Sequence, residues 1–244
     1  MKKSLILKTE INEIKIDDVK NQLLNSQGLS IALCNANSVV RAYKNPKLNN
    51  TLSEFDICTS DGFPIALAFR ILYKKKQRRV DGFKLFNQTL IESEDKNITH
   101  YLFGNTEEVV EKIINKFKNS HPGVNIIGYV CPPILEVDDL LDEKYISEII
   151  KLKPSIVWVS LGFPKQEQFI SRFTRKYQSE SNFVGVGFTF DWTAGTKFKA
   201  PEFLANIGLE WLFRLVQEPR RLFKRYLIDN FLFIIYFIKQ YRKK

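Results

Sequence analysis

The sequence is poor in residues that interrupt or cross-link a chain. Its 244 residues include only 9 prolines, 11 glycines and 3 cysteines, beside 44% apolar residues. This balance excludes a disordered or low-complexity chain and indicates a packed core. Cys34, Cys58 and Cys131 are odd in number and lack a Cys-x-x-Cys spacing. They therefore exclude a disulfide framework and predict reduced thiols in a cytosolic protein.

Motifs for metals and common cofactors are also missing. The two histidines, His100 and His121, do not have the spacing of zinc ligands. The sequence contains no Gly-x-Gly-x-x-Gly after the early strands, no phosphate-binding Gly-x-x-x-x-Gly-Lys-Ser/Thr loop and no Asp-x-Asp pair. A nicotinamide site and a P-loop site are excluded on this basis. We expect no metal and no cofactor.

Long hydrophobic runs are absent as well. The N-terminal MKKSLILKTEINEIKI turns polar after a few apolar residues, which is too short for the core of a signal peptide. The longest apolar run of the C-terminal tail, 231–238, has 8 residues, whereas a bilayer-spanning helix needs about 20. The sequence therefore predicts neither export nor a spanning anchor.

Positive charge is abundant and is concentrated at the C-terminus. The net charge is +10, and residues 211–244 carry nine Lys or Arg against two acids, or +7. Such a balance requires an acidic partner, which could be nucleic acid, anionic lipid or a phosphorylated substrate. Within this tail, 219–241 has apolar residues every three or four positions and reads as a basic amphipathic helix. Its apolar face could lie on anionic lipid, on the protein's own core or on a second subunit.

Strand-like and helix-like stretches alternate along the rest of the chain. Strands are predicted at 29–36, 55–62, 98–105, 124–130, 155–162 and 183–191, with helices between them. Strand–helix alternation predicts an α/β fold with a mainly parallel sheet and helices on both faces. Ligands in such folds bind beyond the carboxyl ends of the strands. Polar residues just past each strand are therefore candidate site residues: Asn35, Asn37, Asp61, Asn105, Gln166, Glu167 and Asp191.

Three turns carry chemistry of their own. Asp61, in TSDGFP, could cap the helix that begins near Pro64 or act as a general base at a strand end. Arg79, in QRRVDGFKLF, could belong to a solvated basic face or bind a pyrophosphate with its planar fork. Gly185 and Gly187, placed within a predicted strand, indicate the close approach of another backbone or a ligand.

Four stretches, taken in order, resemble one family of bacterial enzymes. They are NANSVV with SDGFP, RRVDGFKLF, SIVWVSLGFPKQEQFI, and GVGFTFDWTAGTKFKAPEFLANIGLEWLFRLVQEPRRLFKRYL. Over about residues 30–230 the chain is similar to the WecG/TagA/CpsF family of glycosyltransferases, glycosyltransferase family 26. The last stretch is the most specific of the four.

The resemblance implies a fold and an activity. The expected fold is α/β, a compact Rossmann-like, mainly parallel sheet of the GT-E type over 1–207, followed by a basic helical appendage over 208–244. The expected reaction is an inverting, metal-independent transfer of an N-acetylmannosamine-type sugar from a UDP-sugar to an undecaprenyl-diphosphate-linked sugar. Such transfers feed teichoic acid, common-antigen or capsule assembly. The enzyme would be peripheral on the cytoplasmic face of the cell membrane.

The resemblance also implies roles for individual residues. Asp61 is the expected base, and Arg79, Arg214 and Arg221 would neutralise the leaving diphosphate in place of a metal. The expected substrate-binding residues are Asn35, Gly62, Gln166, Glu167, Gly187, Asp191 and Arg225. The first half of the appendage would act as a lid that carries the arginines, and its second half would contact the membrane.

Two positions depart from the family pattern and leave alternatives open. Leu33 stands where the family often has Thr, and Lys84 stands where it often has Asp. Both departures put contacts to the donor sugar in doubt. One alternative is a catalytically inactive, membrane-binding protein. The other is a nucleic-acid-binding protein, since the basic, aromatic-rich tail could grip phosphates.

Overall fold

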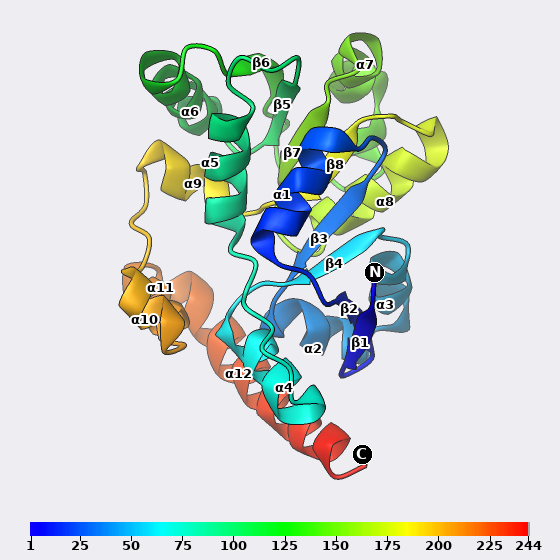
Figure 1. The fold of residues 1–244 in the computed structure, drawn as a ribbon, viewed down its shortest axis with the longest axis vertical. Helices are drawn as coiled ribbons and strands as arrows, with labels where there is room; N and C mark the ends of the chain where they lie inside the picture. Colours follow the sequence, from blue (N-terminus) through cyan, green and yellow to red (C-terminus); the bar gives the residue numbers. More distant parts are fainter. Residues whose placement is uncertain (244) are drawn as a thin grey trace.

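A six-stranded parallel sheet forms the centre of the computed structural model, which describes residues 1–243 apart from the side chains of Arg221, Lys224 and Arg225 (Figure 1). The strand order is β4-β3-β8-β7-β5-β6, and each neighbouring pair runs parallel. The strands are β3 (Ser30–Cys34), β4 (Ile57–Ser60), β5 (Thr99–Gly104), β6 (Asn125–Val130), β7 (Ile156–Ser160) and β8 (Asn182–Gly185). The predicted parallel sheet is confirmed.

Helices connect the strands and cover both faces of the sheet (Figure 1). Those within the sheet region are α1 (Ile16–Asn25), α2 (Ala36–Lys44), α3 (Pro46–Ser53), α4 (Phe63–Tyr73), α5 (Gly82–Glu92), α6 (Glu107–Ser120), α7 (Glu143–Leu152), α8 (Lys165–Tyr177) and α9 (Thr189–Ala194). They are followed by α10 (Glu202–Asn206), α11 (Glu210–Gln217) and α12 (Pro219–Tyr241).

Side-chain alternation along each strand divides the core into two layers. On β3, Ile31 and Leu33 pack with α1, α5, α6 and α9, whereas Ala32 and Cys34 pack on the opposite face with α2, α3, α4, α7 and α8. This arrangement follows from the two-residue period of a strand. Both layers are apolar, as the continuous hydrophobic runs of the strands predict.

The last predicted strand, 183–191, extends farthest beyond its observed end, and one pair of strands was not predicted. β8 ends at Gly185 because the N–H groups of Val186 and Gly187 both turn to the carbonyl of Val159. The chain then bends at Gly187 and continues as helix α9, so the predicted strand 183–191 is wrong beyond residue 185. The unpredicted pair is an antiparallel hairpin, β1 (Lys3–Ile6) and β2 (Thr9–Asn12).

The predicted helix 219–241 is confirmed with the same bounds, as α12. It packs along α2, with Phe233 only 7% exposed and Tyr236 stacked on Tyr43 at 4.4 Å between ring centroids. Near its end, Gln240 accepts the N–H of Leu7 at 2.8 Å and donates to the carbonyl of Leu5 at 2.9 Å. Within the described chain, no helix combines the length and apolar character that crossing a membrane requires.

Candidate active site

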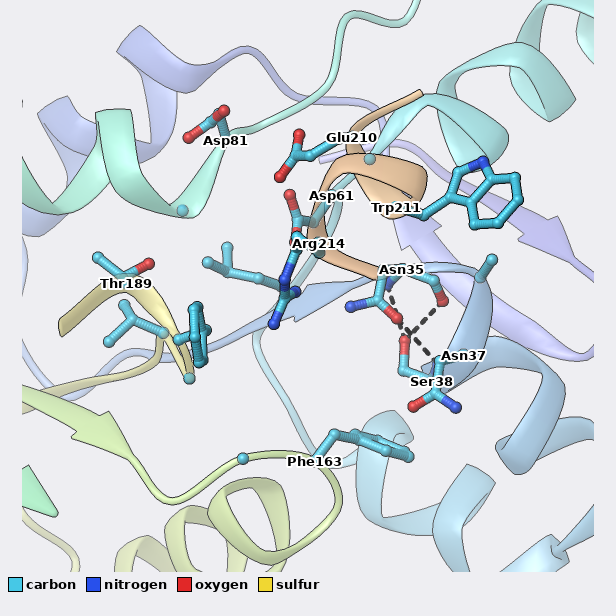
Figure 2. Close-up of a pocket in the computed structure, with 18 of the residues that line it drawn as sticks. Asn35, Asn37, Ser38, Asp61, Asp81, Phe163, Thr189, Glu210, Trp211 and Arg214 are labelled. Atoms are coloured by element: carbon cyan, nitrogen blue, oxygen red, sulfur yellow. Dashed lines mark hydrogen bonds between the residues drawn. The ribbon is translucent and has the colours of Figure 1, made fainter. Parts of the chain in front are cut away.

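A cavity of about 230 Å³ opens at the carboxyl edge of the sheet, where β3, β4, β7 and β8 end (Figure 2). Helices α11 and α12 of the appendage close its other side. The cavity is lined by three of the predicted acidic and basic residues, Asp61, Glu167 and Arg214, and by the predicted Asn35, Asn37, Gly62, Gln166 and Gly187. The structure therefore brings these candidates from separate parts of the sequence into one pocket.

Asp61 follows β4 directly and lies in the wall of this cavity. Its N–H donates to the carbonyl of Cys34 at 2.7 Å, which fixes the turn against the end of β3. Gly62 comes next with φ of +87°, a conformation that favours glycine. Helix α4 begins after Gly62 without a side-chain cap, so the alternative of Asp61 as a helix cap is wrong. Among the described residues, its carboxyl has no hydrogen-bond partner.

The surroundings of Asp61 favour a protonated carboxyl. Burial and the nearby carboxylates of Asp81 and Glu210 together raise the pKa of Asp61 to about 8, against the opposing charges of Arg79 and Lys199. A carboxylate in such a place is a much stronger base than one in water. A raised pKa in a pocket is typical of catalytic acids and bases.

Arg79 is bound to two acids beside the cavity. Its guanidinium donates to Glu210 of α11 at 2.8 Å and lies 3.3 Å from Asp81. The loop that carries it is held to the end of β4, because Val80 donates to the carbonyl of Ser60 at 2.7 Å. Arg79 lines a neighbouring groove and does not line the cavity itself. It joins the appendage to the sheet in this structure.

Asp81 is a second acid held beside Asp61. Its carboxylate caps helix α5 through the N–H of Lys84 and lies 2.7 Å from the Lys199 ammonium. Burial alone would raise the pKa of Asp81, but Lys199 and the cap hydrogen bond bring it below its ordinary value. Asp81 is therefore ionised while Asp61 holds a proton, so the two neighbouring carboxyls differ in protonation state.

Arg214 projects from α11 into the cavity (Figure 2). Its guanidinium carbon lies 4.4 Å from the ring centroid of Phe188 and 5.3 Å from that of Trp192. No carboxylate forms an ion pair with Arg214 in the described part of the chain. Since the aromatic faces hold this cation without using its N–H groups, those donors stay available for an anion.

Asn35 caps helix α2 at the edge of the cavity. Its side-chain oxygen accepts the N–H of Ser38 at 3.2 Å, and its own N–H donates to the Ser38 hydroxyl at 2.8 Å (Figure 2). Asn35 therefore has a structural role as the cap of α2. The capped N-terminus of this nine-residue helix faces the cavity, where its partial positive charge favours anions.

Gln166 and Glu167 form the floor of the cavity. The Gln166 amide accepts the N–H of Gly162 at 3.1 Å and donates to Glu167 at 2.9 Å. A Cβ atom on Gly185 would stand 2.8 Å from the Gln166 amide nitrogen. The close approach that Gly185 indicated is therefore made by the Gln166 side chain. Gly187 lies beyond the strand and lines the cavity with φ of +52°.

Three other expectations from the sequence have different outcomes. Asp191 lies in the first turn of α9, where it accepts a hydrogen bond from Asn105 at 2.9 Å, and the structure does not bring it to the cavity. Its expected place at the end of a strand is wrong because β8 stops at Gly185. The side chains of Arg221 and Arg225 lie outside the described residues.

The two departures from the family pattern have local partners. Leu33 lines the cavity and packs over Gly82, where its Cδ1 is 2.7 Å from the place that a Cβ would take. Lys84 points outward and pairs with Glu202 at 2.6 Å. Leu33 therefore makes that part of the wall apolar, and Lys84 stands outside the cavity.

The sequence analysis missed Glu210, Lys199 and Trp192. Each contacts a residue of the site, namely Arg79, Asp81 (itself not predicted) and Arg214, respectively. All three lie in the long C-terminal stretch that carries the family resemblance, and that resemblance was the one feature of the sequence that could have indicated them. Across the described residues, no group of three or more His, Cys, Asp or Glu side chains could hold a metal ion.

Comparisons with known proteins show the family to which the chain belongs. The model of the WecG/TagA/CpsF glycosyl transferase family matches residues 5–244. The chain is 29% identical to the N-acetylglucosaminyldiphosphoundecaprenol N-acetyl-beta-D-mannosaminyltransferase of Bacillus spizizenii, with 80% of this chain and 74% of the relative covered. It is 25% identical to the enzyme of the same name from Staphylococcus aureus (strain MW2), with 94% and 89% covered.

Proposed function

Since this chain belongs to the WecG/TagA/CpsF family of glycosyl transferases, we propose that it moves an N-acetylmannosamine-type sugar from a UDP-sugar to an undecaprenyl-diphosphate-linked N-acetylglucosamine. The relatives' names describe this acceptor and this sugar. The observation that carries the proposal is the pocket itself. Among the described residues, its Asp61 carboxyl has no hydrogen-bond partner and its Arg214 guanidinium has no ion pair, and both lie at the carboxyl edge of the sheet.

The reaction in this proposal is a single displacement with inversion. A hydroxyl oxygen of the acceptor sugar attacks the anomeric carbon of the donor, and the bond from that carbon to the UDP oxygen breaks. The hydroxyl proton passes to the Asp61 carboxylate. UDP departs with the electrons of the broken bond. Asp61 must be ionised for this step, and its raised pKa makes it a stronger base once it is.

Stabilisation of the leaving diphosphate is assigned to Arg214 and to the N-terminus of α2. Arg214 is held by ring faces and the helix N-terminus lines the same cavity. Preorganised donors of this kind stabilise developing negative charge without a metal. Arg79 can join them only if the diphosphate displaces Glu210 from it. Arg221 and Arg225 stay in the proposal as further cations of the lid.

An anionic membrane is the proposed site of action, on its cytoplasmic face. Of the 22 large hydrophobic side chains exposed in the described part of the chain, 14 lie between residues 198 and 241. Residues 211–244, which overlap this region, carry +7 of the net charge of +10. Apolar and cationic groups together are typical of a surface that lies on anionic lipid. The acceptor's lipid would be held in that membrane, next to the pocket.

The two alternative functions are not favoured. A nucleic-acid-binding protein has no use for a carboxyl whose pKa is raised at a strand edge. An inactive membrane-binding protein would not need Arg214 and Asp61 in one cavity, and the Leu33 and Lys84 departures leave both residues in place.

The decisive experiment measures UDP release and product mass with UDP-N-acetylmannosamine and a short-chain prenyl-diphosphate-N-acetylglucosamine. We expect transfer by the wild type and a loss of at least about 100-fold in Asp61→Asn, because a general base contributes roughly 10²–10⁴-fold. Absence of product with the wild type would overturn the substrate assignment. Near-normal turnover by a folded Asp61→Asn variant would remove Asp61 as the base.

A matched control is available on the same strand. Asp56 stands just before β4, at the end opposite Asp61, and accepts hydrogen bonds from the N–H and hydroxyl of Ser30, both at 2.8 Å. Asp56→Asn should leave transfer within about threefold of the wild type, as a surface substitution does. The assay is repeated with EDTA and then magnesium. Loss with EDTA and recovery with magnesium would overturn the metal-independent reaction.

A further inference from the structure

Asn37 is a buried amide in the wall of the cavity that has no role in the steps above. It lies in the first turn of α2, two residues beyond Asn35, and is 6% exposed. It lines the same cavity as Asp61 and Arg214. The sequence pattern marks it as one of the polar residues after a strand, but the family resemblance gives it no role.

The orientation of this amide is fixed by a residue of the appendage. The Asn37 amide nitrogen donates to the carboxylate of Asp229 on α12. A carboxylate only accepts hydrogen bonds, so the nitrogen must face α12 and the oxygen must face the other way. Figure 2 shows the Asn37 carboxamide between Asn35 and Phe163 in the wall of the pocket.

The oxygen of Asn37 lacks a hydrogen bond. It is buried, and no donor in the described part of the protein reaches it. Buried polar atoms in folded proteins nearly always have a partner, and an exception calls for an explanation. A ligand group that contacts this oxygen leaves it without a partner unless that group donates a hydrogen bond. The ligand group at this place must then be a hydrogen-bond donor.

We propose that the Asn37 side-chain oxygen accepts a hydrogen bond from a sugar hydroxyl or acetamido N–H, and so selects the hexosamine bound in this pocket. This inference rests on the proposed function and adds a specificity-determining residue to it. Phosphate oxygens have no proton to offer at neutral pH and are excluded from this place. The diphosphate must therefore lie toward Arg214 and the backbone N–H groups at the start of α2, and the sugar toward the Asn37 side-chain oxygen.

The same contact couples the sugar to the appendage. Asn37 would accept from the sugar through its oxygen and donate to Asp229 through its nitrogen. Hydrogen bonds that share one amide strengthen each other. A sugar bound at Asn37 therefore favours the state in which α12 is docked on α2. A sugar without the matching donor would leave the oxygen unpaired and lose this advantage.

The test compares KM for the two substrates in Asn37→Ala. Donor KM is measured with UDP-N-acetylmannosamine, and acceptor KM with short-chain prenyl-diphosphate-N-acetylglucosamine. We expect KM to rise roughly 10- to 100-fold for one of them, as for one lost hydrogen bond to a buried acceptor. The substrate whose KM rises identifies the sugar that Asn37 contacts. If neither KM changes by more than about twofold in the folded variant, the inference is wrong.

A swapped pair separates ligand recognition from misfolding. Asn37→Asp alone sets two carboxylates against each other and should weaken both α12 docking and transfer. Asn37→Asp combined with Asp229→Asn restores the hydrogen bond with the donor on α12 and keeps an acceptor oxygen in the cavity. We expect the double variant to recover KM to within about threefold of the wild type. A double variant that folds normally yet recovers nothing would overturn the proposal.

Asn12 supplies the matched structural control. It is 1% exposed on β2 and accepts the N–H of Cys58 at 2.9 Å, outside the cavity. Asn12→Ala should lower the melting temperature and leave both KM values unchanged. Wild-type protein that transfers no sugar would contradict the proposed function. Transfer with an Asn37→Ala KM equal to that of the wild type would contradict only the role of Asn37.

Discussion

The buried position of Asp61 makes it a stronger base and also lowers the stability of the folded protein when Asp61 is ionised. Its carboxyl is crowded by Asp81 and Glu210 and has no hydrogen-bond partner among the described residues. The same burial that makes it a strong base makes its ionised form unfavourable in the folded protein. Residues of this kind commonly lower stability where they provide activity.

Asp61→Asn should therefore stabilise the protein in a pH-dependent way. The folded-state pKa, about 8, lies above the ordinary value of 3.8, so the unfolded chain loses this proton first as pH rises. Wild-type stability then falls across this window and levels off above about pH 8. Asparagine does not titrate. We expect the melting temperature of Asp61→Asn to match the wild type near pH 4 and to exceed it by at least about 2 °C at pH 8.

The comparison uses thermal unfolding at several pH values, with Asp56→Asn as the control. Asp56 accepts two hydrogen bonds from Ser30, so its loss should lower the melting temperature at neutral pH. A melting temperature for Asp61→Asn that is unchanged or lower at pH 8 would show that Asp61 is not strained in the folded state.

The guanidinium of Arg214 is held by aromatic rings, whereas that of Arg79 is held by two carboxylates. Arg214→Lys keeps the charge but loses the planar fork and much of the contact with Phe188 and Trp192. We expect kcat/KM for transfer to fall about 10- to 100-fold in Arg214→Lys and about 100- to 1,000-fold in Arg214→Ala. The measurement is UDP release at varied donor concentration.

Arg172 on α8 provides the comparison for Arg214. It forms a surface ion pair with Asp138 and lies outside the cavity. Arg172→Lys should retain wild-type kcat/KM, because exposed ion pairs contribute little. Equal effects of the two substitutions would mean that the Arg214 fork has no special role.

At the scale of the element, α12 has two different faces. One face carries Phe233, Tyr236 and Gln240, which contact the core, α2 and the β1–β2 hairpin. The other face carries a stripe of exposed apolar residues spaced by three and four, namely Phe223, Leu227, Phe231, Ile234, Ile238 and Tyr241. From the sequence alone, the apolar face of this helix could pack on the protein's core, lie on lipid or contact a second subunit. The helix packs on the core with one face and keeps the other exposed.

Truncation after Asn230 should consequently do more than weaken membrane contact. It removes Phe233 from the core and Gln240 from the hairpin. Loss of a buried Phe side chain alone costs about 3–5 kcal/mol. We expect a lower melting temperature and weaker transfer even to a water-soluble, short-chain acceptor.

Gln240→Ala tests the smaller part of this contact. It removes both hydrogen bonds to the hairpin but leaves Phe233 in place. A melting temperature lower than the wild type by a few degrees is expected. If truncation after Asn230 leaves the melting temperature unchanged, α12 does not stabilise the sheet region.

At the scale of the whole molecule, apolar exposure and positive charge coincide. The exposed stripe of α12 lies near the described cations Arg220, Lys239, Arg242 and Lys243 in sequence. The end of this helix extends away from the sheet (Figure 1). A surface of this type binds anionic lipid through apolar burial and through charge attraction at once, and salt weakens only the charge attraction.

A triple variant in which Phe231, Ile234 and Ile238 are changed to Ser tests this surface. We expect its flotation with phosphatidylglycerol vesicles to be at least about tenfold weaker than that of the wild type, since each apolar side chain buried in lipid contributes about 1.5–3 kcal/mol. The matched control changes three exposed apolar residues elsewhere, Ile134, Ile150 and Leu152, to Ser. Flotation that is equal for both variants would contradict the membrane face. A change in molar mass in place of flotation would assign this stripe to a second copy of the chain.

Much of the fold could be predicted because its signals are local. The helix expected to begin near Pro64 begins at Phe63 as α4, with Pro64 in its first turn. Alternating or continuous apolar runs gave the six parallel strands. Glycine-rich residues after β8 were harder to predict, because the end of a strand depends on where its neighbours stop pairing.

The sequence by itself determined the strand–helix alternation, the polar residues at the strand ends and the family. Tertiary structure decided what those residues do. Among the described residues, it left the Asp61 carboxyl and the Asn37 side-chain oxygen without a hydrogen-bond partner, and it paired Arg79 with Glu210, 131 residues further along the chain. The physical reason is the distance along the sequence over which each interaction acts. Periodicity and capping act over a few residues, whereas ion pairs and burial depend on which distant segments the fold brings into contact.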